Sequence, residues 1–295
     1  MSLLDEWLAG SGLLIGDGAM GTMLQAAGLE PGDAPERLNT ASPKVVRSIH
    51  EAYIAAGADV VTTNTFGGNR FRLSLHGLNG CTRELNQAGA GIAREAADGS
   101  GRRVLVAGSA GPTGALLQPV GELSFEDARD IFAEQCRGLA EGGADFILLE
   151  TMSDLEEVRA GAEGARVACG LPVFCTMTFD THGRTMMGVS PRRAALEMAG
   201  AGIRAIGSNC GNGPSEMEKI LNEMSLANPG LPLIVQSNAG IPRAREGEVR
   251  YEAGAREMAA HAVRCREGGA RYIGGCCGTT PAHIRAMSEA LRRGN

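Results

Sequence analysis

The 295-residue sequence lacks any apolar run of the roughly 20 residues that a membrane-spanning helix needs. Its first residues, MSLLDEWLAGSGLL, lack the basic start and the cleavage signature of a secretory signal peptide. It also lacks lysine and arginine blocks, and the formal net charge is -6, so nothing in it favours nucleic acid as a partner. We therefore expect a cytoplasmic protein that binds neither membranes nor nucleic acid.

What the sequence does contain is a repeated alternation of two patterns. Eight short apolar runs, each bounded by glycine or a polar residue, predict buried strands: 13–17, 59–64, 104–109, 145–150, 173–179, 204–209, 233–238 and 271–275. Between them lie stretches with the apolar spacing of helices, among them 43–57, 125–143, 154–170, 192–202 and 251–269. Eight such units predict an α/β protein with a single (β/α)8 TIM barrel over residues 1–295. An open, doubly wound sheet is the alternative.

The barrel prediction also locates the chemistry, because active sites of this fold lie at the carboxyl ends of the strands. Each predicted strand ends in polar or reactive residues, and these should converge on one mouth. In chain order they are Asp17, Asn64, Ser109, Glu150, Thr178 with Asp180, Asn209 with Cys210, Asn238, and Cys276 with Cys277.

The eight cysteines, without an export signal, indicate reduced thiols and not a disulfide framework. Cys81 lies in a polar loop, and four others fall in apolar or helical patterns typical of small core residues. These four are Cys136, Cys169, Cys175 and Cys265. The remaining three, Cys210, Cys276 and Cys277, stand in glycine-rich turns at predicted strand ends.

Three thiolates suit a soft or borderline metal, above all zinc, and three protein ligands leave one tetrahedral position open. Asn238 is the nearby residue that would add a weak, displaceable oxygen ligand. Three ordinary buried cysteines, a strained vicinal disulfide and a redox role are the alternatives. The surrounding glycines, Gly274, Gly275 and Gly278, favour the metal site because they let the backbone bend and aim both sulfurs.

An open site of three thiolates activates water poorly but holds another thiolate well, since metal coordination deprotonates a bound thiol. The inferred chemistry is alkyl transfer to a substrate thiol. A hydrolytic zinc site would instead use histidine or carboxylate ligands. None of the five histidines ends a predicted strand, so a surface or capping role is expected for His50, His76, His182, His261 and His283. After the cysteine pair, Thr280 and Pro281 are expected to begin a helix as N-cap and first residue.

Several segments resemble the homocysteine S-methyltransferase family, which includes the homocysteine-binding module of cobalamin-dependent methionine synthase and the betaine-homocysteine methyltransferases. They run in family order along nearly the whole chain: GDGAMGTMLQ (16–25), TNTFGGNR (63–70), AGPTGALLQPVG (110–121), LLETMSD (148–154), GSNCGNGP (207–214), VQSNAG (235–240) and GGCCGTTPAHI (274–284). The resemblance implies a barrel that binds zinc and homocysteine. It implies zinc ligation by the cysteines at 210, 276 and 277, with Asn238 as a ligand when substrate is absent.

The resemblance further implies that Asp17 and Glu150 bind the amino group of homocysteine, as two carboxylates at a barrel mouth can do. A capping role in the turn is the alternative for Asp17. The substrate carboxylate would meet the backbone amides of Gly18 and Ala19, at a turn entering a helix. For Thr63 and Asn209, also placed at the substrate site, we expect a role in orienting neighbouring groups.

The sequence does not fix the methyl donor. The resemblance retains a betaine-like donor and a methylcorrinoid presented by a separate protein, with S-methylmethionine or S-adenosylmethionine behind them. Animal betaine enzymes carry tyrosines where this sequence has Gly67 and Thr151, so their aromatic cage is missing, and Phe66 and Phe179 are the aromatic residues at strand ends. TFDTHGRTMMGVSP (178–191), in contrast, is similar to segments of bacterial proteins classed as betaine-homocysteine methyltransferases.

Two further points stay open in the sequence. One is whether the barrel catalyses the transfer or only binds zinc and a thiol without catalysis. The other is the oligomeric state, a homo-oligomer included.

Overall fold

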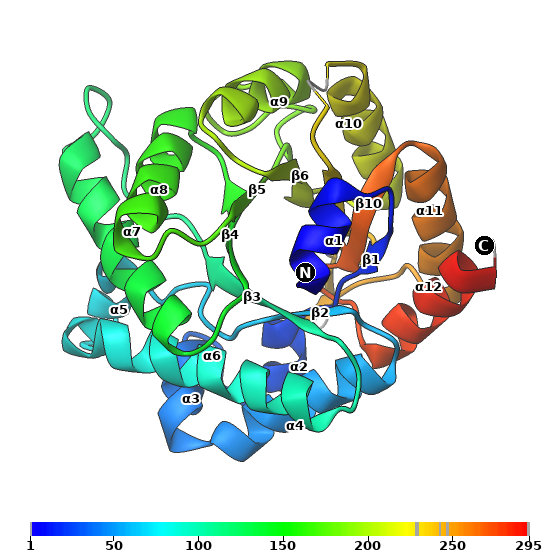
Figure 1. Cartoon of the computed structure of the whole chain (residues 1–295), viewed down its shortest axis with the longest axis horizontal. Helices are drawn as coiled ribbons and strands as arrows, with labels where there is room; N and C mark the ends of the chain where they lie inside the picture. The colour runs from blue at the N-terminus through cyan, green and yellow to red at the C-terminus, as the bar shows by residue number, and fades with distance from the viewer. Residues whose placement is uncertain (1, 228–229, 242, 246–247, 294–295) are drawn as a thin grey trace.

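The computed structural model describes residues 2–227, 230–241, 243–245 and 248–293. Its main sheet has eight parallel strands in the order β1-β10-β7-β6-β5-β4-β3-β2, and a parallel bridge between Gly16 and Val60 joins the two ends of that order. The sheet is therefore a barrel, which confirms the predicted (β/α)8 fold (Figure 1). Its strands are β1 (Leu14–Ile15), β2 (Val60–Thr62), β3 (Leu105–Ala110), β4 (Phe146–Met152), β5 (Val173–Met177), β6 (Ala205–Cys210), β7 (Leu233–Ser237) and β10 (Ala270–Gly275).

Helices surround the sheet on its outside (Figure 1). The five helices expected from periodicity are present as α4 (Pro43–Ala55), α7 (Phe125–Glu141), α8 (Leu155–Ala168), α9 (Pro191–Gly200) and α11 (Ala255–Glu267). The ring is completed by α6 (Thr82–Gly99), α10 (Pro214–Ala227) and α12 (Pro281–Arg293). Shorter elements lie in the connections: α2 (Met20–Ala26), η1 (Pro35–Arg37), α3 (Leu38–Ala41), α5 (Arg70–Ser74), η2 (Asn79–Cys81), and the antiparallel pair β8 (Arg243–Arg245) and β9 (Glu248–Arg250).

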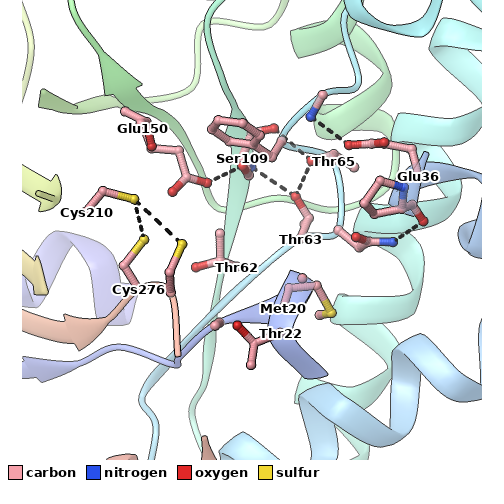
Figure 2. Close-up of a pocket in the computed structure, with 18 of the residues that line it drawn as sticks. Met20, Thr22, Glu36, Thr62, Thr63, Thr65, Ser109, Glu150, Cys210 and Cys276 are labelled. Atoms are coloured by element: carbon pink, nitrogen blue, oxygen red, sulfur yellow. Dashed lines mark hydrogen bonds between the residues drawn. The ribbon is translucent and has the colours of Figure 1, made fainter. Parts of the chain in front are cut away.

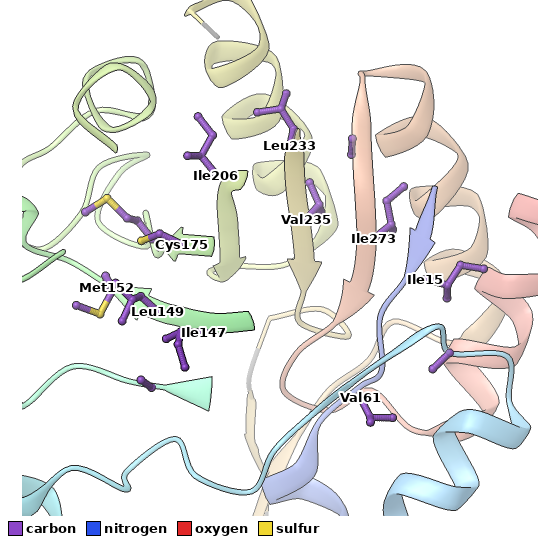
Figure 3. Close-up of a cluster of buried hydrophobic side chains, with 14 of the residues drawn as sticks. Ile15, Val61, Ile147, Leu149, Met152, Cys175, Ile206, Leu233, Val235 and Ile273 are labelled. Atoms are coloured by element: carbon purple, nitrogen blue, oxygen red, sulfur yellow. The ribbon is translucent and has the colours of Figure 1, made fainter. Parts of the chain in front are cut away.

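Each strand separates two apolar layers, because successive side chains of a strand point to opposite faces. In β4, Ile147 and Leu149 belong to the cluster between sheet and helices, part of which Figure 3 shows. Phe146 and Leu148 belong to a second cluster, inside the barrel. Burial on both faces explains why the strands read as continuous apolar runs.

The helix α1 (Leu3–Ala9) supplies Leu4 and Trp7 to the inner cluster, and Figure 1 shows it over the barrel axis. The ring centroid of Trp7 lies 5.6 Å from that of Phe174, and its indole N–H donates to the carbonyl of Arg271. Because Phe174 is an early residue of β5, α1 closes the end of the barrel opposite the carboxyl ends of the strands. The other end is left for the site. In the part of the chain that the structure describes, no helix combines the length and apolar character needed to cross a membrane.

Candidate functional site

Three cysteine sulfurs meet at the mouth of the barrel. Cys210 is the last residue of β6, and Cys276 and Cys277 directly follow β10. The Sγ atom of Cys210 lies 2.9 Å from Sγ of Cys276 and 4.0 Å from Sγ of Cys277 (Figure 2). All three sulfurs lie within 4.8 Å of one another, and all eight cysteines of the chain are free thiols. The fold therefore assembles a three-sulfur donor set from two distant segments.

The backbone around these sulfurs has unusual geometry. Cys210 has a φ of 62°, in the left-handed region that a residue with a side chain seldom occupies. Of the three glycines expected to bend the second segment, Gly278 does so, with a φ of 77°. Gly274 and Gly275 do not have positive φ and serve close packing instead, since a Cβ on Gly275 would lie 2.4 Å from the hydroxyl of Thr279.

Asn238 stands next to this donor set. Its side-chain N–H donates to the carbonyl of Gly211, the residue after Cys210, at 2.8 Å. Its Oδ1 atom is buried and has no hydrogen-bond partner among the residues that the structure describes. Because buried polar atoms are normally paired, the free oxygen fits a weak ligand to a metal held by the three sulfurs.

The sulfur set has polar neighbours as well. Hydrogen bonds from Cys210 and Cys276 hold the pKa of Cys277 well below its usual range, and the hydroxyl of Tyr251 acts in the same direction. The Tyr251 ring packs on Gly278, where a Cβ would come within 2.2 Å of it. Sequence reasoning missed Tyr251 because it follows a hairpin and does not end a barrel strand.

Two acids, the buried Asp17 and the partly buried Glu150, lie in the same cavity as the sulfurs. Asp17 accepts hydrogen bonds from the backbone N–H of Thr62 at 2.7 Å and from its hydroxyl at 2.9 Å, and Glu150 accepts one from the hydroxyl of Ser109. Burial raises the pKa of each acid to about 7, and the charge of Glu150 adds to the rise for Asp17. Two acids that desolvation penalises in this way are suited to an incoming cation.

In the turn at Gly18 and Ala19, which is expected to bind the substrate carboxylate, one of the two backbone amides already forms a hydrogen bond within the protein. The N–H of Ala19 donates to the hydroxyl of Thr279 at 3.1 Å, so this amide already has a partner. Gly18 must lack a side chain, because a Cβ there would lie 2.6 Å from the Thr279 hydroxyl and 2.9 Å from the Tyr53 ring. Both residues line the cavity, together with Met20, at which α2 begins.

Asn209 and Thr63 each bond to neighbouring residues of the site. The side-chain oxygen of Asn209 accepts from the backbone N–H of Thr151 and from the hydroxyl of Thr176, each at 2.8 Å. Its N–H donates to the Thr151 hydroxyl at 2.7 Å and lies 3.9 Å from Sγ of Cys276. The hydroxyl of Thr63 accepts from the N–H of Ser109 and thereby supports the residue that holds Glu150.

The three cysteines, the two acids and Thr63 line one cavity of about 550 Å³, whereas Asn209 and Asn238 lie behind its lining. The structure adds lining residues from loops that the strand-end rule does not reach, among them Met20, Thr22, Glu36, Arg72 and His76. Of the two aromatic residues at strand ends, Phe66 lines the cavity and Phe179 is buried in the core. The cavity therefore continues from the sulfurs and acids into an outer part of mixed charge.

The histidines differ from their expected surface or capping roles in two cases. His50 and His261 are buried, and within the described part of the chain neither ring nitrogen of His50 has a hydrogen-bond partner. His283 does act at a helix start, since its Nδ1 accepts from the N–H of Thr280. The helix α12 begins at Pro281, as predicted, but the Thr280 hydroxyl contacts the His283 ring and not a backbone amide.

Comparison with known proteins agrees with this arrangement. The sequence profile of the homocysteine S-methyltransferase family matches residues 14–291. The methionine synthases of Mycobacterium tuberculosis and Mycobacterium leprae are 39% and 38% identical to the chain over 95% and 96% of its length, and the chain spans 24% of each. The metallated form of the homocysteine methyltransferase MmuM from Escherichia coli superposes with a TM-score of 0.81 at 26% identity, covering 97% of this chain and 99% of that one.

Proposed function

Because the chain belongs to the homocysteine S-methyltransferase family, a family of methyltransferases, we propose that residues 1–295 bind homocysteine and transfer a methyl group to its sulfur, giving methionine. The observation that carries the proposal is the meeting of three cysteine sulfurs and two desolvated acids in one cavity. A thiol amino acid needs both parts, one for its sulfur and one for its ammonium group. The expectation that the protein is cytoplasmic stays a prediction.

Zinc is the metal that fits the donor set. Cys210, Cys276 and Cys277 would hold it, and the unpaired Oδ1 of Asn238 would occupy the fourth position until substrate replaces it. When bound, zinc stabilises the thiolate form of a substrate thiol at neutral pH. Asn209 helps to keep the sulfur of Cys276 in place through its N–H.

The remaining residues orient the amino acid. Asp17 and Glu150 would pair with the substrate ammonium, and this pairing offsets the desolvation that raises the pKa of both acids. The substrate carboxylate would meet the amide of Gly18 and the amides at the start of α2, since the amide of Ala19 is engaged with Thr279. Thr63 supports Glu150 through Ser109, and Asn209 holds Thr151, the residue after Glu150.

In the transfer itself, the sulfur of homocysteine forms a bond to the methyl carbon while the bond from that carbon to the donor breaks. The electron pair of the broken bond leaves with the donor. The outer part of the cavity, beside Phe66 and Glu36, is the place from which a donor would approach.

Three donors remain under this proposal: a betaine-like small molecule, a methylcorrinoid presented by a protein, and, behind these two, S-methylmethionine. Among the described residues, Phe66 is the one phenylalanine, tyrosine or tryptophan that lines the cavity. A single ring does not form an aromatic cage, so a donor held by such a cage is disfavoured. Exposed apolar side chains in the segments after β2 and β3 favour a protein as the carrier of the methyl group. They are Phe66, Phe71, Leu75, Leu116 and Val120.

The test is a donor panel with the zinc-loaded protein. Homocysteine is incubated with betaine, methylcobalamin or S-methylmethionine, and methionine is measured by mass spectrometry, with Cys277→Ser as the inactive control. Methionine formed with one donor by the parent alone supports the proposal and identifies the donor. If homocysteine binds without releasing a proton and no donor yields methionine, the barrel is a zinc and thiol-binding protein without methyl transfer, the second candidate function.

A further inference from the structure

A buried chain of three hydrogen-bonded side chains lies behind the sulfur site and takes no part in the proposed chemistry. The hydroxyl of Ser237, at the end of β7, lies 2.6 Å from Nε2 of His261 on α11. The Nδ1 atom of His261 lies 2.7 Å from a carboxylate oxygen of Glu218 on α10, and Arg264 also binds that oxygen. These hydrogen bonds therefore join the outer helices α10 and α11 to the carboxyl end of β7.

The protonation of this chain follows from its environment. Burial lowers the pKa of His261, so the ring is neutral at pH 7, and its Nδ1–H donates a hydrogen bond to the carboxylate of Glu218. Nε2 is then an acceptor, and the Ser237 hydroxyl donates to it. Sγ of Cys265 lies 3.4 Å from Nε2 and 3.6 Å from Nδ1 and packs against the same ring.

This serine, histidine and glutamate have the connectivity of a hydrolytic triad, but the burial of the serine excludes that role. Ser237 is 0% exposed and His261 is 1% exposed, so no substrate carbonyl reaches the hydroxyl. Ser237 is also absent from the lining of the cavity at the barrel mouth. The three hydrogen-bonded side chains therefore have a structural role and do not react with a substrate.

The three side chains hold β7, the strand that lies between the two sulfur-bearing segments β6 and β10. Ser237 pairs in register with Cys210 on β6 and with Gly275 on β10. Its carbonyl accepts the N–H of Cys276 at 2.8 Å, and the next residue is Asn238. Ser237 is thus the register partner of Cys210, the hydrogen-bond partner of Cys276 and the chain neighbour of Asn238.

We propose that His261 is a positioning residue of the sulfur site, which anchors Ser237 to Glu218 and so fixes the spacing of Cys210 and Cys276 around a bound metal. The proposal rests on the proposed function only in taking the three sulfurs as a zinc site. Residues that orient metal ligands typically change metal affinity about 10- to 100-fold when replaced. Because His261 acts through the backbone of Ser237, we expect its removal to have an effect of about tenfold, at the lower end of that range.

The protein offers a matched control in His50, which is as buried as His261 but forms no hydrogen bond to any described residue through either ring nitrogen. The experiment compares His261→Leu, His261→Gln, Ser237→Ala and His50→Leu with the parent. Zinc affinity is measured by competition with a chelator, and the absorption of the Co²⁺-loaded protein reports sulfur geometry. Thermal unfolding of the metal-free variants measures general destabilisation.

We expect His261→Leu and Ser237→Ala to bind zinc about tenfold more weakly and to shift the Co²⁺ spectrum, with recovery in His261→Gln, which keeps a polar group near Ser237. His50→Leu should keep the affinity and the spectrum of the parent whatever its thermal stability. If His261→Leu does not fold, Ser237→Ala decides. Parental affinity and spectrum in the folded variants, or an equal loss in His50→Leu, would overturn the positioning role, whereas a parent that binds no zinc would overturn the proposed function.

Discussion

The Sγ atoms of Cys210 and Cys276 lie 2.9 Å apart although 66 residues separate them in the sequence. The strand β7 makes this possible, because it pairs with β6 on one side and with β10 on the other, so that both cysteines reach the mouth at one height. Neither cysteine segment forms the site alone. Metal binding should therefore depend on an intact barrel as well as on the ligands.

Replacement of Cys277 by serine removes one of the three thiolates. We expect zinc affinity to fall by more than the about 100-fold seen when only the surroundings of ligands are changed. Competition with a chelator measures the affinity, and Cys81→Ser, which alters a partly exposed thiol in η2, is the control. Equal zinc binding by Cys277→Ser and the parent would refute the three-sulfur site.

Ligand affinity should depend on pH through the acid pair. The pKa of Asp17 and of Glu150 is raised to about 7, and only the ionised forms pair with an ammonium group. A group with this pKa is only about 10% ionised at pH 6, so affinity should be about tenfold or more lower at pH 6 than at pH 8.

Binding of the product methionine, followed by calorimetry, tests this dependence without interference from an ionising thiol. Asp17→Asn and Glu150→Gln should bind methionine weakly and with a flatter pH profile. The assignment of the acids fails if the parent binds methionine equally well at both pH values.

The same acids should destabilise the protein when no ligand is bound. Because the pKa of Asp17 is higher in the folded than in the unfolded chain, the folded state holds more protons between about pH 4 and 7, and the free energy of unfolding falls as pH rises through this window. Asp17→Asn removes this cost and should raise the unfolding temperature at pH 8 by about 2–4 °C for each kcal/mol gained.

Scanning calorimetry of the ligand-free proteins at pH 5 and pH 8 checks this prediction. The gain from Asp17→Asn should shrink at pH 5, where Asp17 of the parent is already protonated. The exposed Glu30→Gln serves as control and should change the unfolding temperature little at either pH. A lower unfolding temperature for Asp17→Asn at pH 8 would contradict the argument.

Gly278 has both a left-handed backbone and a close neighbour. Gly278→Ala should cost about 1–2 kcal/mol of strain from its positive φ, and more from the clash with the Tyr251 ring. Gly77→Ala shares the positive φ, at 67°, but a Cβ there meets nothing within 4 Å. Chemical denaturation should show a larger loss for Gly278→Ala, with partial recovery when Tyr251→Ala is added.

Zinc affinity separates the two glycines further, because Gly278 follows a sulfur ligand and Gly77 lies outside the site. We expect weaker zinc binding in Gly278→Ala and parental binding in Gly77→Ala. Equal losses of stability in both variants would show that the packing of Tyr251 on Gly278 contributes nothing.

The sequence by itself determined the eight strands and placed reactive side chains at their ends. It could do so because both faces of each strand are buried, which leaves an apolar run, and because parallel strands of a barrel end at one mouth. Asp17, Glu150, Cys210, Cys276 and Cys277 were all found in this way, and the structure brings them to one cavity.

Only the tertiary structure decided the features that depend on contacts across long separations. It decided that α1 closes the far end of the barrel, that the amide of Ala19 is engaged with Thr279, and that Asp17 and Glu150 are buried deeply enough to have raised pKa values. His261 shows why, since its helical surroundings predicted a surface or capping role while packing placed it against Ser237. Local patterns report which side of an element is apolar, whereas the partner that a buried polar group finds is set by how the elements pack.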